Sequence, residues 1–203
     1  MVRKASDATK RGRPPEFDRA EVVSAAVQAF WKKGFADTSL NDLETATGVD
    51  RSTIYNSFDG KQGLYDSATD AYLDEAEDTL FQSLNSGTAG VADILDFLDR
   101  LAQGLSSNNA SSGCLVVNDV ASTTGERATN RYLHQLEGGL RSVLQRSGSS
   151  GETDLSRASA RAQLITAAVL GVNLVHGGKT DPATSLGMID SLRAEIGSWA
   201  EKS

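Results

Sequence analysis

The stretch TSLNDLETATGVDRSTIYNSFDGKQGLY, from Thr38 to Tyr65, decides the fold. Thr38 or Ser39 can cap a short helix that stops at Gly48, because hydroxyl residues favour helix starts and glycine favours helix ends. Asp50 can cap a second short helix, Arg51 to Phe58. Two short helices joined by a glycine turn predict a helix-turn-helix.

The second of these helices turns polar side chains outward. They are one cation, one amide, one phenol and three small hydroxyl residues: Arg51, Asn56, Tyr55, Ser52, Thr53 and Ser57. A helix with such donors fits the major groove of DNA, which is about 12 Å wide. Any short polar helix also exposes Ser, Thr and Asn to solvent, so composition alone leaves both interpretations open.

Residues 16–76 resemble the DNA-binding domain of TetR-family transcriptional regulators. The features that match that family are Phe30, Gly34, Thr38, Ser39, Gly48, Val49, Tyr55, Phe58, Lys61 and Leu64. The resemblance implies that Ser39 and Lys61 each reach a phosphate. It also implies a set of residues that face DNA, namely Arg51, Ser52, Thr53, Tyr55, Asn56 and Ser57.

Two residues depart from the family pattern. Glu44 stands four residues before the turn glycine, where the family usually has a small alanine. Either its side chain points outward or the two helices are spaced differently. Asp50 stands where serine is common, which keeps the capping role but places a negative charge near the DNA backbone.

The rest of the chain is also predicted to be helical, so the fold class is all-α. Apolar residues recur at helical spacing, and no segment alternates with period two. A first helix follows Asp18 and ends at Gly34, and a long helix runs from Lys61 to about Leu84. The remaining predicted helices are Val91–Leu105, Cys114 to about Thr123, Glu126–Arg146 with a kink at Gly138–Gly139, about Thr153–His176, and Ala183–Ala200.

Beyond residue 76 the chain is similar to the TetR family in layout, with one sharper match. GCLVVN, from Gly113 to Asn118, resembles the start of the sixth helix in one TetR subgroup, whose members also carry RGRP before the first helix. The resemblance implies about nine helices. We divide the chain into a flexible basic arm over 1–15, a helix-turn-helix domain over 16–76, and a larger regulatory domain over 77–203 for ligand binding and dimerisation. Position alone suggests the cavity residues Phe97, Leu101, Cys114, Leu115, Asn118, Tyr132, Gln135 and Asn173.

The last two predicted helices combine small and apolar residues, which suits a homodimer interface. The alternative is that these residues pack inside one chain. The predicted interface residues are Leu164, Ala167, Ala168, Leu170, Gly171, Leu174, Leu186, Ile189, Leu192 and Ile196. A two-fold dimer predicts a palindromic operator with half-sites about 34–36 Å apart, or more.

Charge is distributed unevenly along the chain. The formal net charge is -7, yet five of the first 13 residues are Lys or Arg. Directly before a helix-turn-helix, Arg11 and Arg13 can reach a DNA minor groove, and Pro14 and Pro15 stiffen the connection. The alternative for this arm is a solubilising tail.

Several function classes are excluded or disfavoured. Cys114 is the only cysteine and the chain has 2 His, so we expect neither an internal disulfide nor a metal, and no cofactor. No enzyme motif is present. The longest apolar run, Leu164–Val175, is shorter than the ~20 residues of a membrane span, and no secretory signal is visible, so we expect a cytoplasmic protein.

These observations predict a ligand-responsive DNA-binding regulator, a repressor that an unidentified small molecule releases from a palindromic operator. Two alternatives stay open. Cys114 either packs as a small buried hydrophobic residue or senses oxidants or electrophiles, because the start of a helix lowers the pKa of a thiol. A helical interaction protein with weakened DNA binding fits the acidic total charge and Glu44.

Overall fold

The computed structural model describes residues 17–107, 113–118, 123–147, 152–178 and 181–200, and its described elements are all helical. The all-α prediction is confirmed, with one helix more than the nine expected. The α-helices are α1 Arg19–Asp37, α2 Leu40–Thr47, α3 Arg51–Phe58, α4 Gly60–Thr79, α5 Gln82–Ser86, α6 Val91–Ser106, α7 Leu115–Asn118, α8 Glu126–Ser147, α9 Glu152–Gly177 and α10 Pro182–Ala200. A short 3-10 helix, Thr123–Gly125, precedes α8.

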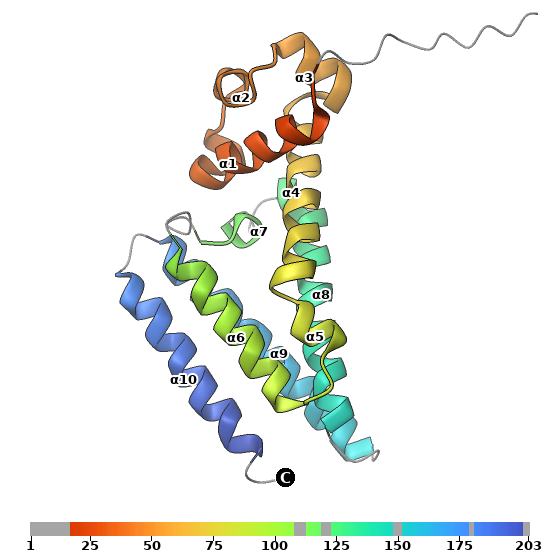
Figure 1. Cartoon of the computed structure of the whole chain (residues 1–203), viewed down its shortest axis with the longest axis vertical. Helices are drawn as coiled ribbons and strands as arrows, with labels where there is room; N and C mark the ends of the chain where they lie inside the picture. Colours follow the sequence, from red (N-terminus) through yellow and green to blue (C-terminus); the bar gives the residue numbers. More distant parts are fainter. Residues whose placement is uncertain (1–16, 108–112, 119–122, 148–151, 179–180, 201–203) are drawn as a thin grey trace, which may run out of the picture.

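Helices α1, α2 and α3 form a head at one end of α4 (Figure 1). The head has its own core, in which the Phe30 ring meets the Tyr65 ring edge-on at 5.0 Å between centroids. Leu43 from α2 and Ile54 from α3 are fully buried in the same core. The short helices are therefore held by burial of a few large side chains rather than by their own length, since isolated helices of eight residues are unstable.

Gly34 interrupts α1 near its end. Its φ of 75° and ψ of 168° are not helical, so the regular helix stops where the sequence predicts. The change of direction brings Phe35 against the Phe30 ring, with 6.1 Å between the centroids. Glycine adopts this positive φ at little cost, whereas a residue with a Cβ would be strained.

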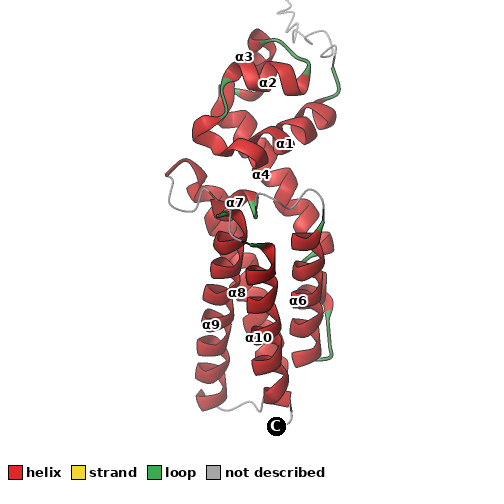
Figure 2. Cartoon of the chain, turned by 90° about the vertical axis from the view of Figure 1, so that its left-hand side faces the viewer, coloured by secondary structure: helices red, strands yellow, loops and turns green. Residues whose placement is uncertain are grey.

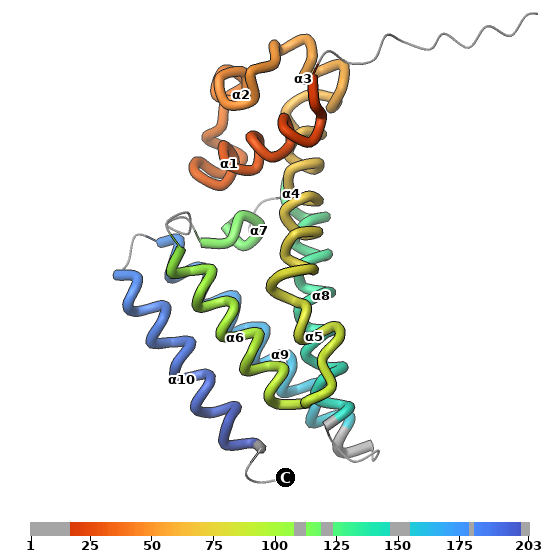
Figure 3. The backbone as a smooth tube through the Cα atoms, viewed as in Figure 1, coloured from red at the N-terminus to blue at the C-terminus, as the bar shows by residue number. Residues whose placement is uncertain are grey.

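The predicted single helix from Lys61 to Leu84 is wrong. Helix α4 ends at Thr79, and α5 begins at Gln82. The turn between them places Phe81 in the core, where its ring lies 5.9 Å from Phe97 and 5.8 Å from Tyr132. Figure 3 shows the backbone changing direction between α4 and α5. The buried contacts of Phe81 with distant helices stabilise this break.

Helices α6, α8, α9 and α10 run alongside one another below the head and form the body (Figure 2). The predicted kink in α8 is absent: the helix is continuous through Gly138 and Gly139. A Cβ on Gly139 would lie 3.0 Å from Leu84 Cβ, so the glycine allows α5 to pack closely against α8. Arg131 of α8 also pairs with Asp74 of α4, at 2.5 Å.

Helix α7, Leu115–Asn118, lies between the two cores, and residues 119–122 of the predicted Cys114 to Thr123 helix lie outside the described residues. Leu115 is buried in the core of the head, whereas Cys114, Val116 and Val117 are buried in the core of the body. The head core also includes Ala68 of α4, and the body core begins at Leu73 of the same helix. Both α4 and α7 therefore connect head and body through buried side chains.

Helix α9 is long and apolar enough over Leu155–Gly177 to cross a membrane by length and composition. The core helix of a soluble protein meets the same criteria, and α9 packs along α8 and α10. Ala162, Val169 and Val172 of this helix are buried in the body core. Its apolar composition is accounted for in part by this packing.

Candidate nucleic-acid interface

Both helices of the helix-turn-helix are capped by their own side chains. Ser39 accepts a hydrogen bond from the Asp42 backbone N–H, and Asp42 accepts one from the Ser39 backbone N–H, which completes a capping box. Gly48, with φ of 72°, ends α2 in the left-handed conformation. Asp50 caps α3 by accepting a hydrogen bond from the Thr53 backbone N–H at 2.7 Å.

The carboxylates at these caps are stable anions. The Lys33 ammonium and the Ser39 hydroxyl and N–H hold the pKa of Asp42 well below its usual range. The Thr53 backbone N–H, with smaller contributions from the Thr53 and Ser52 side chains, lowers the pKa of Asp50. The surface that carries α3 therefore contains fixed negative charges beside its donors.

The outward face of α3 is exposed to solvent. Arg51, Ser52, Tyr55 and Asn56 are exposed, and Tyr55 is one of the few large hydrophobic side chains of the described chain that is more than half exposed, at 55%. Its ring lies over the α3–α4 turn, 3.1 Å from where a Cβ on Gly60 would be. A side chain at Gly60 would displace the ring.

The other predicted DNA-facing residues are partly engaged within the head. Thr53 and Ser57 are half-buried. The Ser39 hydroxyl donates to Asp42 at 2.7 Å. The Lys61 ammonium lies 4.3 Å from the centre of the Phe35 ring and 3.5 Å from the Ala36 carbonyl. Their roles in DNA binding stay predictions, as do those of the exposed residues of α3.

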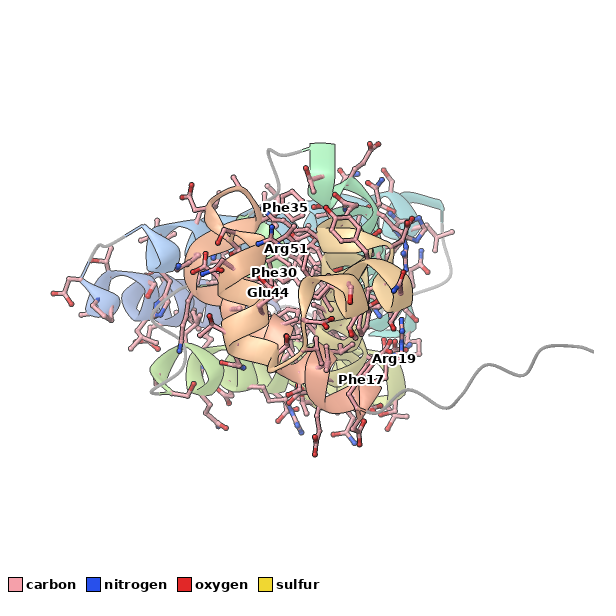
Figure 4. All side chains as sticks on the ribbon, turned by 90° about the horizontal axis from the view of Figure 1, so that it is seen from above. Phe17, Arg19, Phe30, Phe35, Glu44 and Arg51 are labelled. Carbon is pink, nitrogen blue, oxygen red and sulfur yellow. The ribbon has the colours of Figure 1, made fainter. Side chains whose placement is uncertain are left out.

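Glu44 points toward α3 instead of into solvent. One carboxylate oxygen accepts a hydrogen bond from the Arg51 backbone N–H at 2.8 Å, and the other pairs with the Arg51 guanidinium at 3.2 Å. Figure 4, which views the head from above, shows the two residues side by side. Glu44 therefore joins α2 to the first turn of α3 and neutralises the only cation on that helix.

Arg19 is a contact of α3 that sequence reasoning missed. Its guanidinium donates to the Ser57 carbonyl at 2.6 Å and lies 4.1 Å from the centre of the Phe58 ring. The Phe17 ring also packs on Phe58. Figure 4 labels Phe17 and Arg19 close together at the start of α1. A separation of 38 residues between Arg19 and Ser57 gives no local signal for this pair. Arg11 and Arg13 of the predicted arm lie outside the described residues.

A pocket of about 540 Å³ lies between the head and the body. It is lined by α1, α4, α6, α8 and α9 together with Gly113 and Cys114. Of the predicted cavity residues, Leu101, Cys114, Tyr132 and Asn173 line it. The other four do not: Phe97 is buried in the body core, Leu115 in the head core, Asn118 is exposed, and Gln135 donates to Glu77 at 2.9 Å.

The expected lowering of the Cys114 pKa is wrong. Burial raises the pKa of the thiol, and hydrogen bonds from the Tyr72 hydroxyl and from the backbone of Val117 and Val116 oppose this only in part. The Cys114 sulfur lies 3.5 Å from the Tyr72 hydroxyl oxygen. A buried neutral thiol is a poor nucleophile, because the thiolate is the reactive form.

The residues predicted for dimerisation divide into two groups. Leu164 and Leu174 are 68% and 49% exposed, and Ala167 is exposed on the same face of α9. The others are more deeply packed: Ala168, Leu170, Gly171, Leu186 and Leu192 are half-buried, and Ile189 and Ile196 are buried in the body core. An apolar strip on α9 thus remains on the surface of the single chain.

Comparison with known proteins connects this arrangement to a family. Residues 22–68 match the model for "Bacterial regulatory proteins, tetR family". The chain is 34% identical over 124 residues to the HTH-type transcriptional repressor ComR of Escherichia coli, covering 57% of this chain and 58% of ComR. It is 26% identical over 111 residues to the repressor BdcR of the same organism, covering 55% and 56%. The matches span less than two thirds of these relatives.

Solved structures share the fold over nearly the whole chain. The TetR-family regulator CifR, solved with its 26-bp operator DNA, has a TM-score of 0.73 and 18% identity, covering 90% of this chain and 98% of CifR. Reduced NemR of Escherichia coli has a TM-score of 0.70 and 22% identity, covering 88% and 94%. At these identities the likeness concerns the fold.

Proposed function

We propose that this chain is a TetR-family transcriptional repressor that binds double-stranded operator DNA as a homodimer, since residues 22–68 match the model of that family and the repressor ComR is 34% identical over 124 residues. The observation that carries the proposal is the exposed polar face of α3, formed by Arg51, Ser52, Tyr55 and Asn56. A rigid helix with these donors can enter the major groove, where arginine and asparagine recognise base edges. ComR and BdcR are repressors and CifR is a transcriptional regulator, and none of the three is described as an enzyme.

Two such heads act together in this proposal. The exposed strip of Leu164, Ala167 and Leu174 on α9 is the contact between copies, because burying it removes apolar surface from water. A two-fold axis then presents two α3 helices to a palindromic site. Residues 16–76 form the DNA-binding domain and residues 77–203 the regulatory domain, with the arm over 1–15 reaching the minor groove.

A small molecule regulates the binding in the same proposal. Its site is the pocket between head and body. The pocket volume of about 540 Å³ lies within the range of about 300–1,000 Å³ that is typical of ligand sites. A ligand that binds one arrangement of the heads more tightly shifts the population toward it, and operator affinity falls if that arrangement separates the two α3 helices. The protein works in the cytoplasm, where its DNA is.

The proposal is tested by selecting duplexes from a random pool with the full chain and sequencing the bound fraction. We expect an enriched palindrome, and a binding constant that falls steeply with KCl because phosphate contacts release counterions. Asn56→Ala should weaken binding to the selected duplex, whereas Asn85→Ala, an exposed asparagine on α5, should not. Failure to enrich any palindrome at low salt contradicts the proposal.

A further inference from the structure

The pocket between head and body offers aromatic ring faces to a ligand. Trp31 of α1, and Tyr72 of α4, meet edge-on at 5.4 Å between ring centroids, and both line the pocket. Their polar groups are already used by the chain: the Trp31 indole N–H donates to the Gly113 carbonyl at 2.6 Å, and the Tyr72 hydroxyl donates to the Cys114 sulfur. The carbon atoms of the two rings therefore remain as what these side chains can offer to a ligand in the pocket.

The charged groups at the pocket sum to -1 when Asp96, the ion-pair partner of Arg100, is counted with Glu75 and Arg100. Glu75 and Arg100 are the charged residues that line it. Arg100 is neutralised by Asp96, at 2.7 Å, and also donates to the Thr79 carbonyl at 3.1 Å. Glu75 is exposed and has no ion-pair partner among the described residues. A carboxylate beside aromatic rings favours a cation, because the ring face carries negative charge density.

We propose that this pocket binds an aromatic organic cation, whose ring packs on Trp31 and Tyr72 and whose positive charge is balanced by Glu75. A volume of about 540 Å³ admits a molecule of two or three fused rings with a short charged substituent. An aromatic anion of the same size is disfavoured, since it would lie beside an unpaired carboxylate.

The position of the pocket links this ligand to the head. Val27, Gln28 and Trp31 line it from α1, so a bound molecule touches the head and the body at once. The hydrogen bond from Trp31 ends on Gly113, which has φ of 69° and where a Cβ would lie 2.9 Å from the Asn173 carbonyl of α9. The ligand thus binds beside Gly113, which bonds to α1 and lies close to α9. In this regulatory role the inference rests on the proposed function.

The ligand class is tested by calorimetry on the full chain with three probes of matched size: naphthylmethyl-trimethylammonium, naphthylmethanol and naphthylacetate. We expect the cation to bind about tenfold more tightly than the anion, with the alcohol between them. In a Trp199→Phe background Trp31 is the only tryptophan, and its emission should change when the cation binds. Binding of none of the probes, or tightest binding of naphthylacetate, overturns the proposal.

Glu75→Gln is the decisive variant, because the Glu75 carboxylate has no ion-pair partner among the described residues whose loss would disturb the fold. This variant should weaken binding of the cation by roughly threefold to fivefold and leave binding of the alcohol unchanged. Asp78→Asn removes an exposed carboxylate from the same helix, outside the pocket, and should change neither. If both variants weaken cation binding equally, the net charge of the protein explains the effect, and the assignment of Glu75 is overturned.

Operator binding is measured on the same preparations. Glu75→Gln should bind the selected duplex as the parent chain does. If the parent chain binds the selected duplex but not the cation, the ligand inference alone is overturned. Cation binding in a chain that recognises no duplex overturns the proposed function and leaves the ligand assignment standing.

Discussion

Glu44 restrains Arg51, so replacing its carboxylate should strengthen DNA binding. The Glu44 side chain is 28% exposed and that of Arg51 54% exposed, which makes their 3.2 Å contact a partly solvated ion pair. Such pairs contribute about 0.2–1 kcal/mol. Arg51 gives up this energy whenever it turns to DNA, so Glu44→Gln should raise operator affinity by up to about fivefold, since 1.4 kcal/mol is about tenfold.

The dependence on salt separates the possible roles of Arg51. If the freed guanidinium binds a phosphate, the slope of log K against log[KCl] should steepen by about 0.9. If it binds a base edge, the slope stays the same and discrimination at one base pair increases by about 1–3 kcal/mol. Fluorescence anisotropy with the selected duplex at several KCl concentrations measures both.

Two further variants isolate the local contact. Glu44→Ala also removes the acceptor for the Arg51 backbone N–H, at 2.8 Å, and should lower stability by about 1 kcal/mol, whereas glutamine keeps an acceptor there. Asp37→Asn removes an exposed negative charge from the head without touching Arg51, and should leave affinity nearly unchanged. If Glu44→Gln binds DNA no better than the parent at unchanged melting temperature, the restraint on Arg51 is refuted.

Three other predictions test separate parts of the molecule. Removing residues 1–13 should weaken operator binding and flatten the salt slope, because the arm that would place Arg11 and Arg13 in the minor groove carries five cations; an unchanged slope in the anisotropy titration would make the arm a tail. Leu164→Asp with Leu174→Asp should give a monomer by light scattering, whereas Leu155→Asp, about half a turn away around α9, should not; a persisting dimer contradicts the α9 contact. Iodoacetamide should react with native Cys114 more slowly than with a free thiol, because burial raises the thiol pKa and the thiolate is the reactive form, and the rate should climb with pH. Mass spectrometry follows the adduct, and alkylation as fast as for a free thiol at neutral pH would show an accessible sensor.

The helix-turn-helix could be predicted from the sequence because its signals are local. Ser39, Gly48 and Asp50 each act within one helical turn, and each cap forms at the expected residue. The long helices beyond the head follow from apolar periodicity for the same reason. Caps and periodicity together account for nearly all of the secondary structure.

The break after α4 could not be predicted, because Leu80 and Leu84 continue a helical spacing whether or not the helix does. What decides is the burial of Phe81 between Phe97 and Tyr132, residues distant in the sequence. The contribution of α1 to the pocket is hidden in the same way. The sequence predicts Trp31 only as a residue of the head core. The hydrogen bond from its indole N–H to the Gly113 carbonyl appears only in the structure.

The dimerisation residues show the same limit of periodicity. The apolar stripe of α10 gives no indication of which partner it faces. Ile189 and Ile196 are buried within the chain, whereas Leu164 on α9 stays exposed. Only the packing of α10 against α6 and α9 separates the two cases.

Helix α7 limits how freely this protein can be recombined with its relatives. An engineer who exchanges heads between family members would cut within α4, where one core gives way to the other. Leu115 lies far beyond that cut in sequence, yet it fills the core of the head. A chimera made at α4 alone would therefore keep a side chain fitted to the discarded head. In such a chimera, position 115 of the body should therefore be replaced by the residue that the donor of the head carries there.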